Sequence, residues 1–161
     1  MRRLVLFLSF IFVMIIVAAI STSQQRHLPP NISASPTPVP TVRLDGTVVR
    51  VELADTSEKR FKGLSGVREM PEDQGMLFVF ESQDVEAQFV MRDMYIPLDI
   101  IWIDNNEVVK IDANLEPRPG VVDDSQLMFY VGNSIDYVLE VNGGFAEKNG
   151  IKVGSKVTLP F

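Results

Sequence analysis

Four charged residues in the central part of the chain have types and spacing suited to ligand binding. They are Arg68, Arg92, Asp93 and Asp99, and three of them lie within the stretch MRDMYIPLD. Arginines and carboxylates that line one concave polar site could bind a small molecule, because clusters of charged groups often mark functional sites. We therefore name these four residues as ligand-binding candidates, and we name no catalytic residue.

Asp99 also has a structural interpretation, because it interrupts an otherwise apolar run, LDIIWID, residues 98–104. A carboxylate in such a run is expected either to face solvent or to pair with an arginine such as Arg68 or Arg92. An ion pair of this kind would hold the neighbouring turn to the sheet. The sequence favours this structural interpretation over a binding site, and both remain open.

Two other groups of carboxylates suggest chemistry. Asp93 and Asp99 could form the acid pair of a glycosidase, which requires carboxyl groups roughly 5–10 Å apart. The segment DNNE, residues 104–107, superficially resembles a calcium loop. It lacks the ligand spacing and the central glycine of such a loop, so a two-residue hairpin turn at 105–106 is the better interpretation.

Several kinds of chemistry are excluded by the residues that the domain lacks. The sequence contains one histidine, His27, which precedes the domain, and it contains no cysteine. The domain therefore offers neither a Ser-His-Asp triad, nor a Cys-His pair, nor a histidine-ligated zinc site. No glycine-rich loop has the spacing that cradles phosphate. We predict no metal and no cofactor, and the sequence favours binding over catalysis.

The amino-terminal segment, residues 1–20, is predicted to be a signal anchor or a signal peptide. Arg2 and Arg3 precede the run LVLFLSFIFVMIIVAAI, which carries no charge. Its length is at the short end for a membrane-spanning helix and at the long end for a cleavable signal. We favour an uncleaved, single-pass anchor in the cell membrane; cleavage would instead give a secreted protein.

The next segment, residues 21–41, is rich in Pro, Ser and Thr and is predicted to be a disordered stalk. Residues 1–41 contain three basic residues and no acidic ones, whereas the whole chain contains 15 basic and 21 acidic residues. The basic start favours an amino terminus in the cytoplasm and a domain outside it. The acidic remainder argues against nucleic acid as a partner.

Residues 42–161 are predicted to form one mostly β domain. Alternating or continuous apolar runs predict strands, and short segments with capping residues or glycines predict helices. The expected strands are 47–54, 76–80, 86–93, 98–104, 107–115, 135–142 and 155–160, and the expected helices lie in 55–64 and 143–150. Asp55 is the expected N-cap of the first helix. Short strands and hairpin connections indicate an antiparallel β-sandwich or a partly closed barrel, because the strands are too close together for crossover helices.

Four blocks of the sequence resemble a known family. They are GLSGVREMPEDQGMLFVF, FVMRDMYIPLDIIWID, YVLEVNGG and NGIKVGSKV, in that order through most of residues 48–159. They resemble DUF192, a bacterial and archaeal family of unknown function, which typically has G-M-L-F, F-W-M-K-N-T and I-P-L-D. In the central motif this chain has Val90, Arg92, Asp93 and Met94 instead of W, K, N and T. The resemblance implies a compact β-sandwich-like domain, often behind a signal or anchor, and implies no established reaction.

Three hypotheses for function follow. The first, which we favour, is a membrane-tethered extracytoplasmic module that binds a small molecule or a protein of the cell envelope. The second is an enzyme that uses carboxylates, with carbohydrate as one substrate class. The third is a purely structural domain.

Overall fold

The computed structural model describes residues 38–118 and 128–161, which all belong to the unit Pro38–Phe161. The predicted membrane segment, residues 1–20, lies outside the described residues, as does most of the predicted stalk. Within 38–118 and 128–161, no helix is long and apolar enough to cross a membrane.

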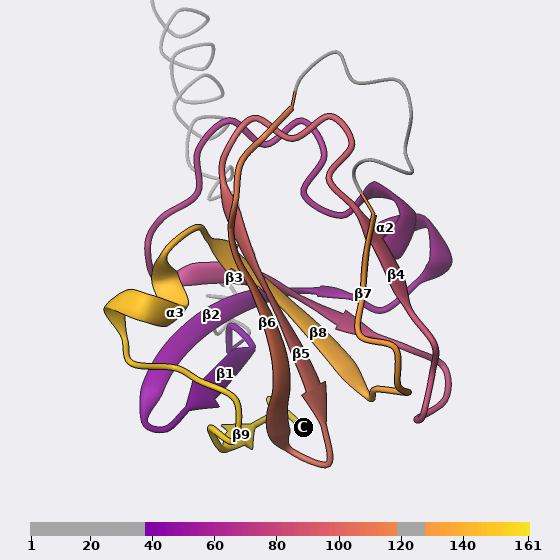
Figure 1. Ribbon diagram of the computed structural model, residues 1–161, viewed down its shortest axis with the longest axis vertical. Coiled ribbons are helices and arrows are strands. Elements are labelled where there is room, and N and C mark those ends of the chain that lie inside the picture. Colours follow the sequence, from indigo (N-terminus) through magenta and orange to yellow (C-terminus); the bar gives the residue numbers. More distant parts are fainter. Residues whose placement is uncertain (1–37, 119–127) are drawn as a thin grey trace, which may run out of the picture. The chain divides into compact units, whose positions relative to one another are not determined.

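A seven-stranded sheet in the order β6-β5-β8-β3-β2-β1-β9 forms the body of the domain (Figure 1). Its strands are β1 Thr41–Leu44, β2 Thr47–Ala54, β3 Gln74–Val79, β5 Leu98–Asp104, β6 Glu107–Leu115, β8 Tyr137–Asn142 and β9 Val157–Thr158. The two ends of the sheet meet, because Glu107 in β6 forms an antiparallel bridge with Lys156 beside β9. The prediction of a mostly β domain is confirmed, and the sheet is a nearly closed barrel.

One pair of strands runs against the predicted antiparallel pattern. β2 and β3 are parallel, with Val51 opposite Gly75 and Leu53 opposite Leu77. The connection between them holds helix α2, Ser57–Lys62, so the argument that the strands lie too close for a crossover was wrong at this point. A short helix with a loop on each side is long enough to carry the chain back, so that β3 runs beside β2 in the same direction.

The two short helices lie on opposite sides of the sheet (Figure 1). Helix α2 begins at the N-cap Thr56, whose hydroxyl accepts a hydrogen bond from the backbone N–H of Lys59 at 3.3 Å. The prediction that Asp55 is the cap was wrong by one residue, because Asp55 instead pairs with the Lys59 ammonium at 2.6 Å. Helix α3 is Phe145–Lys148, and Phe145 and Ala146 are buried.

The sheet separates two hydrophobic cores. The inner core fills the barrel with side chains such as Leu77, Ile101 and Leu139. The outer core contains Phe78, Ile100, Trp102 and Val138, which alternate with the inner set along the same strands. Strands β3, β5 and β8 are therefore buried on both faces, which explains their nearly continuous apolar sequences.

A separate two-stranded ribbon contributes to the outer core. It consists of β4, Gln88–Val90, and β7, Met128–Tyr130, paired antiparallel with Phe89 opposite Phe129. Phe89 is 9% exposed and packs in the outer core. The ribbon and the segment that follows β4 bring side chains over the outer face of the main sheet, where the candidate site lies.

Candidate functional site

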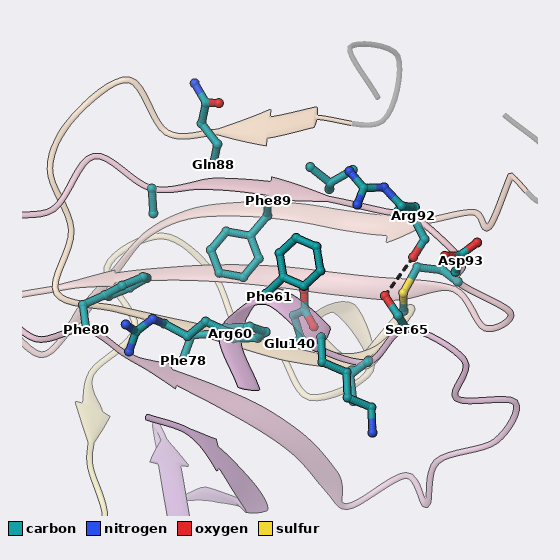
Figure 2. Close-up of a pocket in the computed structure, with 16 residues that line it drawn as sticks. Arg60, Phe61, Ser65, Phe78, Phe80, Gln88, Phe89, Arg92, Asp93 and Glu140 are labelled. Atoms are coloured by element: carbon teal, nitrogen blue, oxygen red, sulfur yellow. Dashed lines mark hydrogen bonds between the residues drawn. The ribbon is translucent and has the colours of Figure 1, made fainter. Parts of the chain in front are cut away.

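A cavity of about 570 Å³ opens on the outer side of the sheet (Figure 2). This volume lies within the range of roughly 300–1,000 Å³ that is usual for small-molecule sites. Residues from α2 and the turn after it, from β3, from β4 and from β8 line it. Its charged side chains are Arg60, Lys62, Arg92, Asp93 and Glu140, and its aromatic side chains are Phe61, Phe78, Phe80 and Phe89.

Glu140 supplies the buried acid of this cavity. It lies in β8, where its register neighbours are Met76 on β3 and Ile100 on β5, both apolar and both buried. The residue is only 7% exposed, and its carboxyl group has no hydrogen-bond or ion-pair partner among the described residues. Burial alone raises the pKa of the Glu140 carboxyl to about 8, because desolvation penalises the charged form.

Aromatic rings form much of the remaining wall. Phe78 and Phe89 meet edge to face with their ring centroids 4.6 Å apart, and Phe89 meets Trp102 in the same way at 5.4 Å. These contacts fix the orientation of the rings. Phe61 differs, because it is 83% exposed and lies on α2, a helix with no buried residue. Phe61 therefore contributes an exposed apolar surface at the cavity.

Two of the four predicted site residues line this cavity. Arg92 and Asp93 are exposed residues that lie next to each other at its edge. The backbone there is held by the turn after α2, since Ser65 Oγ donates to the carbonyl of Arg92 at 3.0 Å and Gly66 N–H donates to that of Asp93 at 3.0 Å. Asp93 has a positive φ of 55°, a conformation that Asp tolerates better than most residues.

Asp99 lies elsewhere and has a structural role. It is fully buried, and its carboxylate accepts hydrogen bonds from three backbone N–H groups: Asn114 at 2.7 Å, Gly144 at 2.9 Å and Ala146 at 2.8 Å. It thus joins β5 to β6 and to the start of α3. The prediction that Asp99 faces solvent or pairs with an arginine was wrong, because backbone donors satisfy both of its oxygens. It does not line the cavity, so an acid pair of Asp93 and Asp99 there is not formed.

Arg68 also lies outside the cavity lining. Its guanidinium group lies over the ring of Tyr95, with the carbon 4.2 Å from the ring centroid. This is a cation–π contact between two exposed residues. The structure therefore does not bring Arg68, Arg92, Asp93 and Asp99 together into one site.

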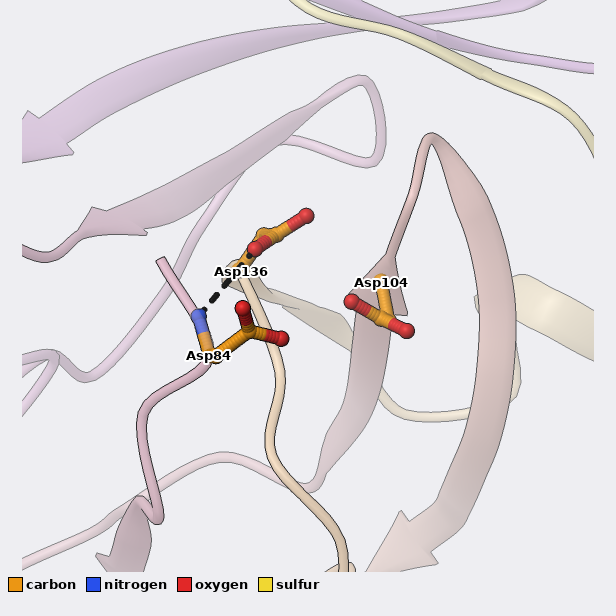
Figure 3. Close-up of side chains that lie close together, drawn as sticks. All are labelled: Asp84, Asp104 and Asp136. Atoms are coloured by element: carbon orange, nitrogen blue, oxygen red, sulfur yellow. Dashed lines mark hydrogen bonds between the residues drawn. The ribbon is translucent and has the colours of Figure 1, made fainter. Parts of the chain in front are cut away.

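Three aspartates form a second group of charges that the sequence did not reveal. Asp84, Asp104 and Asp136 each place a carboxylate oxygen within 4.8 Å of the others (Figure 3). The Asp136 carboxylate accepts hydrogen bonds from the backbone N–H groups of Asp84, at 3.3 Å, and of Asn105, at 3.0 Å. Asp104 Oδ1 is buried and has no partner among the described residues. The hairpin predicted at 105–106 is confirmed, with φ of 49° and 58° at its two asparagines.

Glu140 was missed at the level of the sequence, although a signal for it exists. The stretch YVLEVN, residues 137–142, places one charge in the middle of an apolar strand. The pattern predicts the strand, and the single charge at its centre is the signal for a buried acid. Burial on both faces of the strand depends on the β4–β7 ribbon, of which the sequence predicted only β4, within the expected strand 86–93.

The chain belongs to the DUF192 family, described as Uncharacterized ACR, whose model matches residues 40–159. No protein with a curated description matches the chain. One similar solved structure is a protein of unknown function from Novosphingobium aromaticivorans, 37% identical, covering 76% of this chain and 84% of that chain with a TM-score of 0.64. Another is a protein from Sinorhizobium meliloti, provisionally named as a transcription regulator, 29% identical, covering 76% of this chain and 94% of that chain with a TM-score of 0.66.

Proposed function

We propose that this protein is a membrane-tethered extracytoplasmic module that binds a small molecule in the cavity above β8. One observation carries the proposal: Glu140 is a residue only 7% exposed, its carboxyl group has no partner among the described residues, and it lines a cavity of about 570 Å³. A buried polar group without a partner costs stability. A ligand bound in the cavity would supply the missing partner of the Glu140 carboxyl group and would offset this cost.

Binding fits the cavity better than catalysis by a pair of acids. The two carboxylates that line the cavity are Asp93 and Glu140. Asp93 is exposed at the edge, whereas Glu140 is surrounded by apolar strands, and the two carboxylates share no partner among the described residues. The aromatic wall and a single deep polar group are typical of a binding pocket.

The tether rests on the sequence. Arg2 and Arg3 precede the apolar run of residues 4–20, and a segment rich in Pro, Ser and Thr separates that run from β1. In this proposal the amino terminus stays in the cytoplasm and the acidic domain lies outside, within the cell envelope. The provisional name of the Sinorhizobium meliloti protein does not extend to a nucleic-acid function here, because the acidic balance disfavours a polyanion.

Ligand-induced stabilisation of the full-length chain in detergent tests the binding function. Amines, sugars, amino acids and short peptides would be added, and thermal unfolding would be followed. A ligand present at 100 times its Kd should add about 2.7 kcal/mol to the free energy of unfolding. Ala87→Trp, which fills the cavity, should abolish the shift, whereas Ala113→Trp, at an exposed position of β6, should retain it.

The same experiment defines failure. A ligand that stabilises the wild type and Ala87→Trp equally would bind outside the cavity and would contradict the proposal. The tether needs a separate test: the full chain should remain with membranes after a high-salt wash, and protease added from outside should digest the domain. Protection of the domain in spheroplasts, whose outer envelope layers are removed, would contradict the proposed orientation.

A further inference from the structure

The charges around the cavity are unevenly satisfied. The guanidinium group of Arg60 donates hydrogen bonds to the carbonyl of Val79 at 2.8 Å and to the Glu81 carboxylate at 3.3 Å. The protein therefore already supplies acceptors for this cation. Glu140, in contrast, has no partner among the described residues. Lys62 and Asp93 also line the cavity, but both are exposed, so water solvates their charges. The unmet requirement of the buried part of the cavity is thus for a group that pairs with Glu140, either a hydrogen-bonding group or a cation.

The raised pKa of Glu140 agrees with the absence of a partner for its carboxyl group among the described residues. The raised pKa of its carboxyl has burial as its cause, without a contribution from any neighbouring charge. The charged side chains that share the cavity are Arg60 and Lys62 from α2, and Arg92 and Asp93 after β4. On β3 and β5 the register neighbours of Glu140 are apolar. A ligand cation would supply the favourable charge that the protein does not provide.

The aromatic wall fits the same kind of ligand. Faces of phenylalanine rings attract cations, and their surfaces also pack against an apolar body. Figure 2 shows the rings of Phe61 and Phe89 and the carboxyl group of Glu140 around one opening. A carboxylate beside aromatic rings distinguishes an ammonium ion from a neutral alcohol of the same shape.

We infer that the cavity binds a primary ammonium ion attached to an apolar body, with Glu140 accepting hydrogen bonds from the ammonium group and Phe61 and Phe89 contacting the body. This inference rests on the proposed function, since it names the ligand class of the same cavity. A primary ammonium is favoured over a quaternary one, because only the former can donate hydrogen bonds to the carboxyl oxygens.

Binding should release a proton. Below pH 8 the free protein holds Glu140 mainly as the neutral acid. When the ammonium ion binds, the carboxyl O–H bond breaks, the proton passes to the buffer, and the carboxylate pairs with the ligand, whose N–H bonds stay intact. At pH 7 this should release close to one proton per ligand. A neutral ligand that accepts a hydrogen bond from the acid should release none.

Calorimetry with matched probes tests the inference on the full-length chain in detergent. The probes are 2-phenylethylamine, 2-phenylethanol and 3-phenylpropionate, each titrated in phosphate and in Tris, which differ in ionisation enthalpy. The amine should bind roughly ten- to hundredfold more tightly than the alcohol, with proton release. Glu140→Gln should remove that preference, whereas Glu147→Gln, an exposed change on α3, should preserve it.

The exposed aromatic residue provides a second variant that does not affect the core. Phe61→Ala should weaken binding of the amine a few-fold, because a cation–π contact at an exposed site contributes modestly. Phe161→Ala, another exposed phenylalanine outside the cavity lining, should have no effect. Equal weakening by both changes would overturn the role assigned to Phe61.

The outcomes separate the inference from the proposed function. Binding of the alcohol or the acid in preference to the amine, lost in Ala87→Trp, would overturn the ligand class and leave the cavity as a binding site. Failure of every probe to bind at millimolar concentration would overturn the ligand class. The binding function itself would be overturned only if the sugars, amino acids and peptides also failed to stabilise the protein. A tripeptide that begins with phenylalanine, tested beside the free amine, distinguishes a peptide amino terminus from a small amine as the source of the ammonium group.

Discussion

Asp99 and Glu140 are two buried acids on neighbouring strands, and they have opposite surroundings. Asp99 is opposite Val141 and Glu140 is opposite Ile100 in the pairing of β5 with β8. Asp99 faces the inner core and accepts three backbone hydrogen bonds, whereas Glu140 faces the outer core with no partner among the described residues. A buried acid with its donors supplied by the fold indicates architecture; one without them beside a cavity indicates a site.

The largest expected effect comes from removing the satisfied acid. Asp99→Ala would leave three backbone N–H groups of the β6 and α3 regions without their acceptor. We expect a loss of about 4 kcal/mol in the free energy of unfolding, measured by urea denaturation. Asp93→Asn is the exposed control and should change stability by less than about 0.5 kcal/mol, since Asn tolerates positive φ. A loss below about 1 kcal/mol for Asp99→Ala would remove the contrast between the two acids.

A comparable effect, but with pH dependence, is expected for the unsatisfied acid. The folded-state pKa of Glu140 is about 8, above its ordinary value of 4.5. Stability linked to this group is therefore fully present below 4.5 and falls as the pH rises through 8. Glu140→Gln cannot ionise, so it should gain roughly 4 kcal/mol over the wild type between pH 5 and pH 9.

Urea denaturation of both proteins across this pH range checks that expectation. Glu147→Gln is a matched change at an exposed site and should follow the wild type at every pH. A constant difference between Glu140→Gln and the wild type from pH 5 to pH 9 would mean that Glu140 is not a buried, unpaired acid.

A smaller effect tests how closely the strand that carries Glu140 is held. A Cβ atom at Gly75 in β3 would lie 2.5 Å from the carbonyl oxygen of Glu140 and 2.9 Å from the side chain of Val141. The first of these neighbours is backbone, so β3 and β8 would have to separate. We expect Gly75→Ala to cost about 2 kcal/mol in thermal unfolding and to weaken ligand binding as well. An unaffected melting temperature would show that the strands adjust at no cost.

The smallest effect is expected at the cluster of three aspartates. Asp84, Asp104 and Asp136 repel one another when all three are ionised and no cation is present. Asp104→Asn should therefore raise the free energy of unfolding by about 0.5 kcal/mol in buffer that contains EDTA. A decrease under those conditions would show that the Asp104 charge is favourable in the fold and that repulsion is not the dominant interaction.

The sequence predicted the strands whose own residues alternate clearly between apolar and polar or end at a recognisable turn. β2, β5 and β6 have the bounds expected from alternation and from the Asn105–Asn106 turn. β1 and β7 were not predicted, because TVRL and MFY are too short to show a period and gain their strand geometry by pairing with β2 and β4.

The candidate site was harder to predict, because it too depends on contacts between segments that are distant in the sequence. Arg92 and Asp93 were found by charge and do line the cavity. The donors that satisfy Asp99 are backbone groups of Asn114, Gly144 and Ala146, which no sequence pattern connects to it. Glu140 becomes notable only when strands from three parts of the chain surround it.

A direct titration of Glu140 shows whether this residue is a buried acid that lacks a partner until a ligand binds. The side-chain carboxyl carbon would be followed by NMR in full-length protein labelled with ¹³C-glutamate, with Glu140→Gln to assign the signal. A buried, unpaired Glu140 should titrate with a pKa of about 8 in the free protein, and this pKa should fall towards ordinary values when 2-phenylethylamine is added. Titration of the free protein near 4.5, unchanged by the amine, would contradict it, because Glu140 would then be solvated or already paired.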